Sequence, residues 1–169
     1  MQSKVAQPII RSARLGDERG IHKAHMRSIR EVCAKAHGPD EIEGWGNRPF
    51  SDKWSQLISS GTLWIVELND QIQGVGYIKI GSDPTKDAAH IFGLYLTPEV
   101  IGKGLGAKLM TMMLEKAKEA GSKVVTLDSS LNAHEFYLRF GFKDTGPLKF
   151  SEIGGSQVQG YPMSLILSV

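Results

Sequence analysis

The sequence predicts a mixed α+β fold that is built around a mostly antiparallel sheet. Two apolar segments, 63–68 and 72–80, flank Asn69 and Asp70, and this arrangement is typical of a β-hairpin. Further along, residues 89–127 read as a strand, a glycine-rich turn, a helix and a second strand. This order predicts an antiparallel meander that gains a strand–helix–strand unit in its second half.

The first third of the chain predicts one strand and two helices. Residues 9–13 are mostly apolar and form a short strand, after which Asp17 can cap a helix that runs to about residue 36. The segment 37–50 contains glycine and proline, so we expect an irregular or partly helical connection there. A second helix follows and ends at Gly61, because glycine readily adopts the backbone conformation that terminates helices.

The second half contains alternating strands and helices with clear turn signals. In order, the expected elements are a polar loop over 81–87, a strand over 89–97, a helix over 104–120, a strand over 124–127, a short helix over about 132–140, and two final strands near 142–150 and 161–168. Glycines at 121 and 141 follow the two helices, as expected for helix C-termini.

Length and composition predict one domain over residues 1–169, with a core from about 8 to 168. The net charge of +2 and the absence of a basic run favour neither nucleic acid nor an acidic membrane surface as a partner. The single Cys33 cannot form an intramolecular disulfide, and we expect it to be a small buried residue. No apolar leader or membrane-length apolar run is visible, so we expect a cytoplasmic protein.

The glycine-rich turn at residues 102–106, with the sequence Gly-Lys-Gly-Leu-Gly, predicts a phosphate-binding site. It lies between a strand and a helix, where backbone N–H groups remain unpaired at the positive end of the helix dipole. Glycines allow a phosphate to approach the backbone closely, because they carry no side chain. A phosphate-bearing cofactor is therefore expected at this turn.

A dinucleotide-binding turn is the main alternative for this segment. Gly102, Gly104 and Ala107 satisfy its glycine pattern, and Asp128 ends the next strand at a suitable distance. However, Thr97, Pro98 and Glu99 separate the glycines from their strand, whereas a dinucleotide turn follows its strand directly. Too few residues remain after Asp128 to complete a doubly wound sheet. A Walker A loop is excluded because no Gly-Lys-Ser/Thr sequence is present.

A second motif lies at residues 132–142, which read Asn-Ala-His-Glu-Phe-Tyr-Leu-Arg-Phe-Gly-Phe. Together with the glycine turn, it resembles the GNAT superfamily of acetyl-CoA-dependent N-acetyltransferases. The resemblance follows the element order from Ile9 to the C-terminus and is sharpest over 91–142. It implies a GNAT-like fold, with a twisted, mostly antiparallel sheet of about six or seven strands, a splayed parallel pair and about four flanking helices.

The resemblance implies acetyl-CoA as co-substrate, no metal, and a cofactor site on the central strand and the turn. The implied cofactor-binding residues are Leu94, Tyr95, Leu96, Ile101, Gly102, Lys103, Gly104, Leu105, Gly106, Asn132 and Tyr137. Ile101 departs from the family pattern, which has arginine or glutamine there, so backbone N–H groups must carry more of the pyrophosphate binding. Lys103 either adds charge to the site or is a solvated loop lysine, and Lys108 can also contribute charge.

Tyr137 and His90 are the candidate catalytic residues. Tyr137 matches the family tyrosine that protonates the leaving thiolate, and a phenol is a suitable donor at neutral pH; the alternative is simple aromatic packing. His90 stands where one branch of the family has a glutamate base, and an imidazole suits that role. The alternative bases are Glu67, Tyr95 and a bound water, and His90 could be merely solvated at a strand end.

The acceptor site is the least specified part of the sequence. The resemblance places it near the link at 37–45, where His37, Glu41 and Trp45 combine acidic and aromatic groups that suit a cationic amine. A solvated loop with an aromatic core anchor is the alternative. We expect acetyl transfer to a small-molecule primary amine by direct attack in a ternary complex, by a monomer or homodimer. Acetylation of a protein N-terminus or lysine, and a non-catalytic acyl-CoA-binding regulatory domain, are the other hypotheses.

Overall fold

The computed structural model describes residues 5–81 and 87–168, so most of the polar loop expected at 81–87 lies outside the described residues. Within them, the strands are β1 (Ile9–Ser12), β2 (Leu63–Leu68), β3 (Gln71–Ile80), β4 (Ala88–Leu96), β5 (Val124–Ser129), β6 (Lys143–Asp144), β7 (Lys149–Ile153) and β8 (Ser156–Ile166). The helices are α1 (Glu18–Glu31), the 3-10 helix η1 (Cys33–Lys35), α2 (Pro39–Trp45), α3 (Lys53–Ser59), α4 (Leu105–Glu119) and α5 (His134–Arg139).

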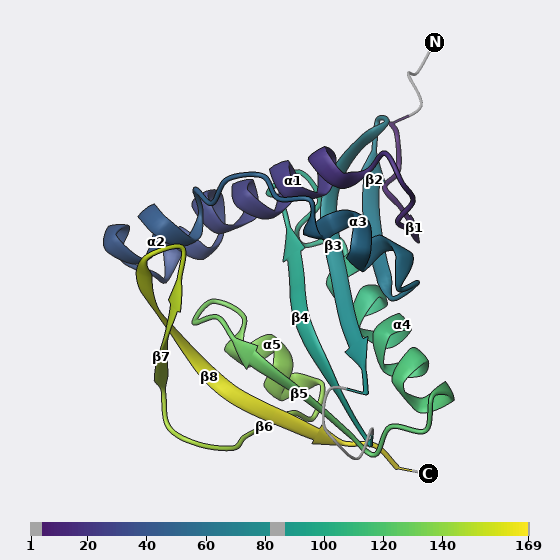
Figure 1. The fold of residues 1–169 in the computed structure, drawn as a ribbon, viewed down its shortest axis with the longest axis vertical. Helices are drawn as coiled ribbons and strands as arrows, with labels where there is room; N and C mark the ends of the chain where they lie inside the picture. The colour runs from purple at the N-terminus through teal and green to yellow at the C-terminus, as the bar shows by residue number, and fades with distance from the viewer. Residues whose placement is uncertain (1–4, 82–86, 169) are drawn as a thin grey trace.

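The strands form a sheet in the order β1-β2-β3-β4-β5-β8-β6, and β7 pairs with β8 (Figure 1). Only β4 and β5 pair in parallel among the described strands; the other pairs are antiparallel. The predicted α+β fold is therefore confirmed, including its antiparallel meander and its parallel pair. The predicted hairpin is confirmed too, with Asn69 and Asp70 at φ 52° and 60° in its turn.

Three predicted boundaries are wrong, and all lie where the local signal is weak. The single strand expected near 142–150 is two short strands, β6 and β7, because residues 145–148 form an irregular connection that contains Gly146 and Pro147. The first helix ends at Glu31 rather than near residue 36, and η1 follows it as a separate turn. The strand expected at 161–168 begins at Ser156 instead, because Gly154 and Gly155 adopt φ 61° and 84° and make a tight β7–β8 turn. The first residues of β8 are mostly polar, so the hydrophobic pattern of the sequence did not predict this hairpin.

Apolar side chains of β2 point alternately to the two faces of the sheet, and helices cover both faces. Leu63 and Ile65 pack with α1 and α3, whereas Trp64 and Val66 point to the opposite face, where α4 and α5 pack. Successive strand residues face opposite sides, so an uninterrupted apolar run such as this one must be covered twice. The two helical layers hold β4 and β5 between them.

The pairing of β4 with β5 stops part-way along β4. Its register runs from Ala88 opposite Val124 to Ile91 opposite Leu127, and beyond this point β4 pairs only with β3. Figure 1 shows the two strands starting side by side and diverging toward α1. A register irregularity at Tyr77/Ile78 leaves Phe92 as an extra residue in β4 at the point of divergence.

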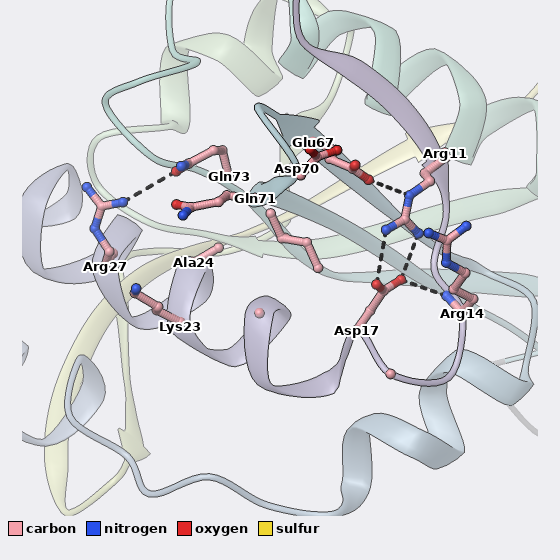
Figure 2. A pocket seen from close by; sticks show the side chains of 13 residues that line it. Arg11, Arg14, Asp17, Lys23, Ala24, Arg27, Glu67, Asp70, Gln71 and Gln73 are labelled. Carbon is pink, nitrogen blue, oxygen red and sulfur yellow. Dashed lines mark hydrogen bonds and ion pairs between the residues drawn. The ribbon is translucent and has the colours of Figure 1, made fainter.

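The start of α1 is held by an ion-pair cluster rather than by the predicted cap. Asp17 occupies the N-cap position, but its carboxylate accepts hydrogen bonds from Arg11 Nη1 (2.8 Å), Arg11 Nη2 (3.0 Å) and the Arg14 backbone N–H (2.8 Å). Arg11 Nε also donates to Glu67 (2.7 Å), which joins β1, β2 and α1 (Figure 2). These hydrogen bonds lower the pKa of Asp17, with Arg11 the main cause.

We expect Asp17→Asn to lower the free energy of unfolding at pH 7 by about 1–2 kcal/mol, because a charged, partly buried acceptor becomes neutral. Since the folded pKa lies below the ordinary value, the ionised carboxylate stabilises the native state above about pH 4 and loses this effect as the pH falls through the folded pKa. Urea unfolding from pH 3 to 7 measures both effects. Asp40→Asn, at an exposed position, is the control; equal losses in both variants would contradict the prediction.

Candidate active site

A cavity of about 310 Å³ lies between β4, the start of α4 and α5, and we call it the glycine-turn cavity. Its lining consists of Ser28, Val32, Cys33, Leu94, Tyr95, Leu96, Ile101, Gly102, Gly104, Leu105, Gly106, Ala107, Ser130, Asn132, Ala133, Phe136 and Tyr137. The predicted cofactor-binding residues thus converge on one cavity, with the exception of Lys103. The structure brings the turn, the central strand and the short helix together, although they are separate in the sequence.

The glycine turn presents unpaired backbone donors to this cavity. Gly102 and Gly104 adopt φ 76° and 77°, which strongly favours glycine, and a Cβ at either position would meet no atom within 4 Å. Within the described residues, the N–H groups of 102–107 have no hydrogen-bond acceptor. These groups lie at the N-terminus of α4, a helix of 15 residues, so the turn fits a phosphate group.

A narrow space of about 20 Å³, which we call the passage, lies in the gap between the diverging strands. It is lined by Ile91, Phe92, Gly93, Leu94, Tyr95, Leu127, Asp128, Ser130 and Tyr137. Tyr137 and Leu94 belong to both the passage and the glycine-turn cavity, whereas Phe92 and Asp128 belong to the passage and to a further cavity near β7. The passage therefore lies between two cavities and shares wall residues with each of them.

The cavity near β7 has a volume of about 220 Å³, and we call it the β7-side cavity. It is lined by Trp45, His90, Ile91, Phe92, Tyr95, Asp128, Ser129, Ser130, Lys149, Ser151, Ile153, Val158, Gln159 and Gly160. Aromatic rings form part of its wall, and His90, Asp128 and Lys149 supply its titratable groups. A molecule in this cavity would reach the passage from the side opposite the glycine turn.

Tyr137 stands at the junction of the passage and the glycine-turn cavity. Its side chain is only 6% exposed and packs against Phe136 and Phe142, with ring centroids 5.4 and 5.9 Å away. Burial raises the pKa of Tyr137, and nearby Cys33 raises it further, so the phenol stays protonated at neutral pH. No hydrogen bond joins its hydroxyl to another described residue, which leaves the proton available to a bound molecule.

His90 lines the β7-side cavity beside the Thr126 hydroxyl. His90 Nδ1 lies 2.7 Å from Thr126 Oγ1, and the same hydroxyl lies 3.5 Å from the Ala89 backbone oxygen. In the tautomer that carries its hydrogen on Nδ1, Nε2 has a free lone pair. Burial lowers the pKa of His90, and the imidazole is therefore neutral and able to take a proton at physiological pH.

Comparison with known proteins decides the family. Residues 33–166 match the family model described as the acetyltransferase (GNAT) domain. The chain belongs to the GNAT family of acetyltransferases. This GNAT chain is 30% identical over 142 residues to the uncharacterized N-acetyltransferase YjgM of Escherichia coli K12, covering 80% of this chain and 82% of YjgM. YafP of the same organism, also an uncharacterized N-acetyltransferase, is 23% identical over 134 residues, with 79% and 80% covered.

Solved structures share the fold of this GNAT chain. A GCN5-related N-acetyltransferase from Rhodopseudomonas palustris superposes with a TM-score of 0.80 at 23% identity, covering 99% of this chain and 100% of its own. PaiA N-acetyltransferase from Thermoplasma acidophilum, solved with coenzyme A, superposes with a TM-score of 0.68 at 20% identity, covering 95% and 99%. The predicted family and the predicted acyltransferase class are confirmed.

The other two candidate bases are placed differently from His90. Glu67 lies in the ion-pair cluster with Arg11, in a cavity beside the β2–β3 turn that the passage does not reach (Figure 2). Tyr95 lines the passage and both cavities that it joins, but burial raises its pKa and keeps its phenol protonated. Of these three candidate residues, His90 alone combines a neutral basic nitrogen with a place in the β7-side cavity.

Of the three residues predicted to bind the acceptor, only Trp45 lines the β7-side cavity. His37 is buried; its Nδ1–H donates to Glu41 and its Nε2 accepts the Leu131 backbone N–H (3.0 Å). Glu41 also accepts from the Gln159 side chain (2.6 Å) and its backbone N–H (3.1 Å). His37 and Glu41 therefore brace the loop after β5 against α2 and β8, and acceptor binding by these residues stays a prediction.

Sequence reasoning missed Asp128, Lys149, Phe92 and Thr126 as site residues. Lys149 comes from β7, which the sequence pattern did not separate from β6. Asp128 fits the acidic position of a dinucleotide-binding pattern in the sequence, and nothing there indicates a role in an acceptor site. The polar residues at the end of β5 and along β7 are a weak signal that a charged pair joins the two strands.

None of the helices in the described ranges is long and apolar enough to cross a membrane. Cytoplasmic location stays a prediction.

We expect Gly104→Ala to weaken coenzyme A binding at least tenfold, because its methyl group would enter the phosphate-binding turn. Gly61→Ala is the matched control. Gly61 has φ 75° and equally open surroundings, but it lies outside the glycine-turn cavity. Both variants bear a similar backbone strain of about 1–2 kcal/mol. Titration calorimetry and thermal unfolding separate the two effects, and equal affinities in folded Gly104→Ala and Gly61→Ala proteins would show that the turn does not bind phosphate.

Proposed function

We propose that this GNAT protein transfers the acetyl group of acetyl-CoA to a primary amine of a small molecule, within a ternary complex. Two neighbouring cavities carry this proposal: the glycine-turn cavity and the smaller β7-side cavity share wall residues with the passage between them, and Tyr137 lines that passage. Such an arrangement lets two substrates bind at once and meet at the passage. It supports direct transfer without a covalent enzyme intermediate.

The glycine-turn cavity is the proposed site of coenzyme A. The N–H groups of 102–107 would hold the pyrophosphate, and the edge of β4 beyond Ile91 has no strand partner on the β5 side. An extended pantetheine arm can bind along such an edge as an added strand would. Coenzyme A in the PaiA structure and acetyl-CoA in that of YncA from Salmonella typhimurium, both sharing this fold, support the assignment.

Acetyl-CoA supplies an acetyl thioester: the amine nitrogen forms a bond to the acetyl carbon, and the carbon–sulfur bond breaks as the thiol leaves. The Tyr137 hydroxyl gives its proton to the departing sulfur from the passage. An acceptor that binds as an ammonium ion first gives one proton to His90 Nε2, on the side of the β7-side cavity. The nitrogen loses its second proton after the bond to the acetyl carbon has formed, and that proton returns to the Tyr137 oxygen. The group that gives a proton to the sulfur and the group that takes the first proton from the nitrogen thus lie on opposite sides of the passage.

The size of the β7-side cavity favours a small acceptor. At about 220 Å³ it is smaller than the range of roughly 300–1,000 Å³ that is usual for ligand sites. Acetylation of a protein lysine is the second candidate, because YjaB of Salmonella typhimurium, named a peptidyl-lysine N-acetyltransferase, is 27% identical over 100 residues. A screen of amines and peptides with acetyl-CoA, measured by thiol release, decides between them. Coenzyme A binding without thiol release from any amine would indicate a non-catalytic domain.

Tyr137→Phe should reduce kcat by about 10²–10⁴, which is typical for loss of a general acid. The variant retains the aromatic ring, so packing against Phe136 and Phe142 and affinity for acetyl-CoA should remain nearly unchanged. Stopped assays of thiol release and calorimetric titration measure the two quantities. Tyr161→Phe, which removes a phenol outside the passage, is the control. Full turnover by Tyr137→Phe would leave this residue with a packing role only.

The pH dependence of kcat/KM tests His90. Because its pKa is lowered, the rate with an ammonium acceptor should rise with pH and level off above an apparent pKa below about 6.5. His90→Ala should be slower at pH 7 and continue to rise, since water must then take the proton. Thr126→Val should impair the reaction more than Thr126→Ser, which retains the hydroxyl next to Nδ1. An unchanged profile in His90→Ala would assign the base elsewhere.

A further inference from the structure

Asp128 and Lys149 form an ion pair in the wall of the β7-side cavity. Asp128 Oδ1 lies 2.9 Å from Lys149 Nζ, and the side chains are 45% and 47% exposed. The pair spans β8, because Asp128 is opposite Pro162 and Lys149 is opposite Gly160. A half-exposed pair of this kind contributes little to stability, so it can open for a ligand at little cost.

The rest of this wall carries no ionised group. Trp45, Phe92 and Tyr95 contribute aromatic surface, and His90 is neutral because burial lowers its pKa. The cavity therefore offers one negative charge, one positive charge beside it, and an apolar surface. An acceptor that carries only an amine would satisfy Asp128 and leave Lys149 without its partner.

The two charges have different positions relative to the passage. Asp128 lines both the passage and the β7-side cavity, whereas Lys149 lines only the cavity. An amine must approach the passage to reach the acetyl carbon, so it must approach Asp128. A negative group on the same molecule would then lie farther out, near Lys149. The order of the charges thus fixes the direction in which a dipolar acceptor binds.

We propose that the acceptor is a free α-amino acid with an apolar side chain, whose ammonium group binds Asp128 and whose carboxylate binds Lys149. This inference rests on the proposed acetyltransferase function. In an α-amino acid both charges are carried on neighbours of one carbon, which matches the close spacing of Asp128 and Lys149. When the amino acid binds, its ammonium group replaces Lys149 beside Asp128, and its carboxylate replaces Asp128 beside Lys149. Neither protein charge is therefore left unpaired.

This recognition separates free amino acids from proteins. A peptide N-terminus has an amide in place of the adjacent carboxylate, and a lysine side chain has no anionic group near its amine. Both would leave Lys149 without a negative partner in the occupied cavity. The ion pair would therefore select against protein acetylation, while the aromatic wall would bind the apolar side chain.

The test compares free L-amino acids with their amides, which retain the amine and the side chain but lack the carboxylate charge. We expect the wild-type enzyme to acetylate an apolar amino acid such as L-leucine with a kcat/KM at least tenfold above that for L-leucinamide. Lys149→Met should lower kcat/KM for L-leucine at least tenfold and change that for L-leucinamide less than twofold. Lys149→Arg should retain most of the activity with L-leucine, and Lys116→Met, an exposed lysine on α4, should change neither rate.

Each other outcome overturns a defined claim. Equal losses for L-leucine and L-leucinamide in Lys149→Met would show that the ion pair has only a structural role, which thermal unfolding of the same variant would confirm. Rapid acetylation of peptides or simple amines, with no activity toward any free amino acid in a panel of the standard set, would overturn the inference and leave the acetyltransferase function intact. Thiol release from no acceptor, in a protein that binds coenzyme A, would overturn both.

Discussion

The end of the β4–β5 pairing is the constraint on which the rest of the site depends. After Ile91 and Leu127 the strands diverge, and the backbone of β4 loses one of its two partners. Buried backbone groups must be satisfied, so an unpaired edge inside a sheet is stable only where a ligand or water can bind. The same divergence leaves room for the passage, which Tyr137 of α5 lines, between cavities on the two sides of the sheet.

Elements far apart in the sequence hold the strands open. On one side, Ser28 of α1 donates to the Leu96 backbone oxygen (2.7 Å), which satisfies an acceptor near the end of β4. On the other, His37 accepts the Leu131 N–H and is itself fixed by Glu41, so the loop after β5 is bound to α2. Buried polar contacts of this kind are costly to break singly. They fix the end of β4 and the loop after β5 on the two sides of the gap.

Local signals in the sequence predicted the local parts of the site. The hairpin at Asn69 and Asp70, the glycine turn and the short helix of Tyr137 each depend on a few adjacent residues, and each forms as expected. Contacts between distant segments could not be predicted in this way. Asp128 and Lys149 meet only because β7 and β5 flank β8, and the Asp17 carboxylate binds Arg11 instead of helix amides because β1 lies beside it.

Burial near the passage controls which groups can react. Cys33 lines the glycine-turn cavity, and as a thiolate it could attack a thioester itself. Burial raises its pKa to about 12, so the thiol stays protonated and unreactive at neutral pH. The same low-dielectric surroundings keep Tyr137 protonated and His90 neutral. A protonated phenol and a neutral imidazole therefore line the described part of the site, the Cys33 thiol beside them is unreactive, and the charges of Asp128 and Lys149 lie where water partly screens them.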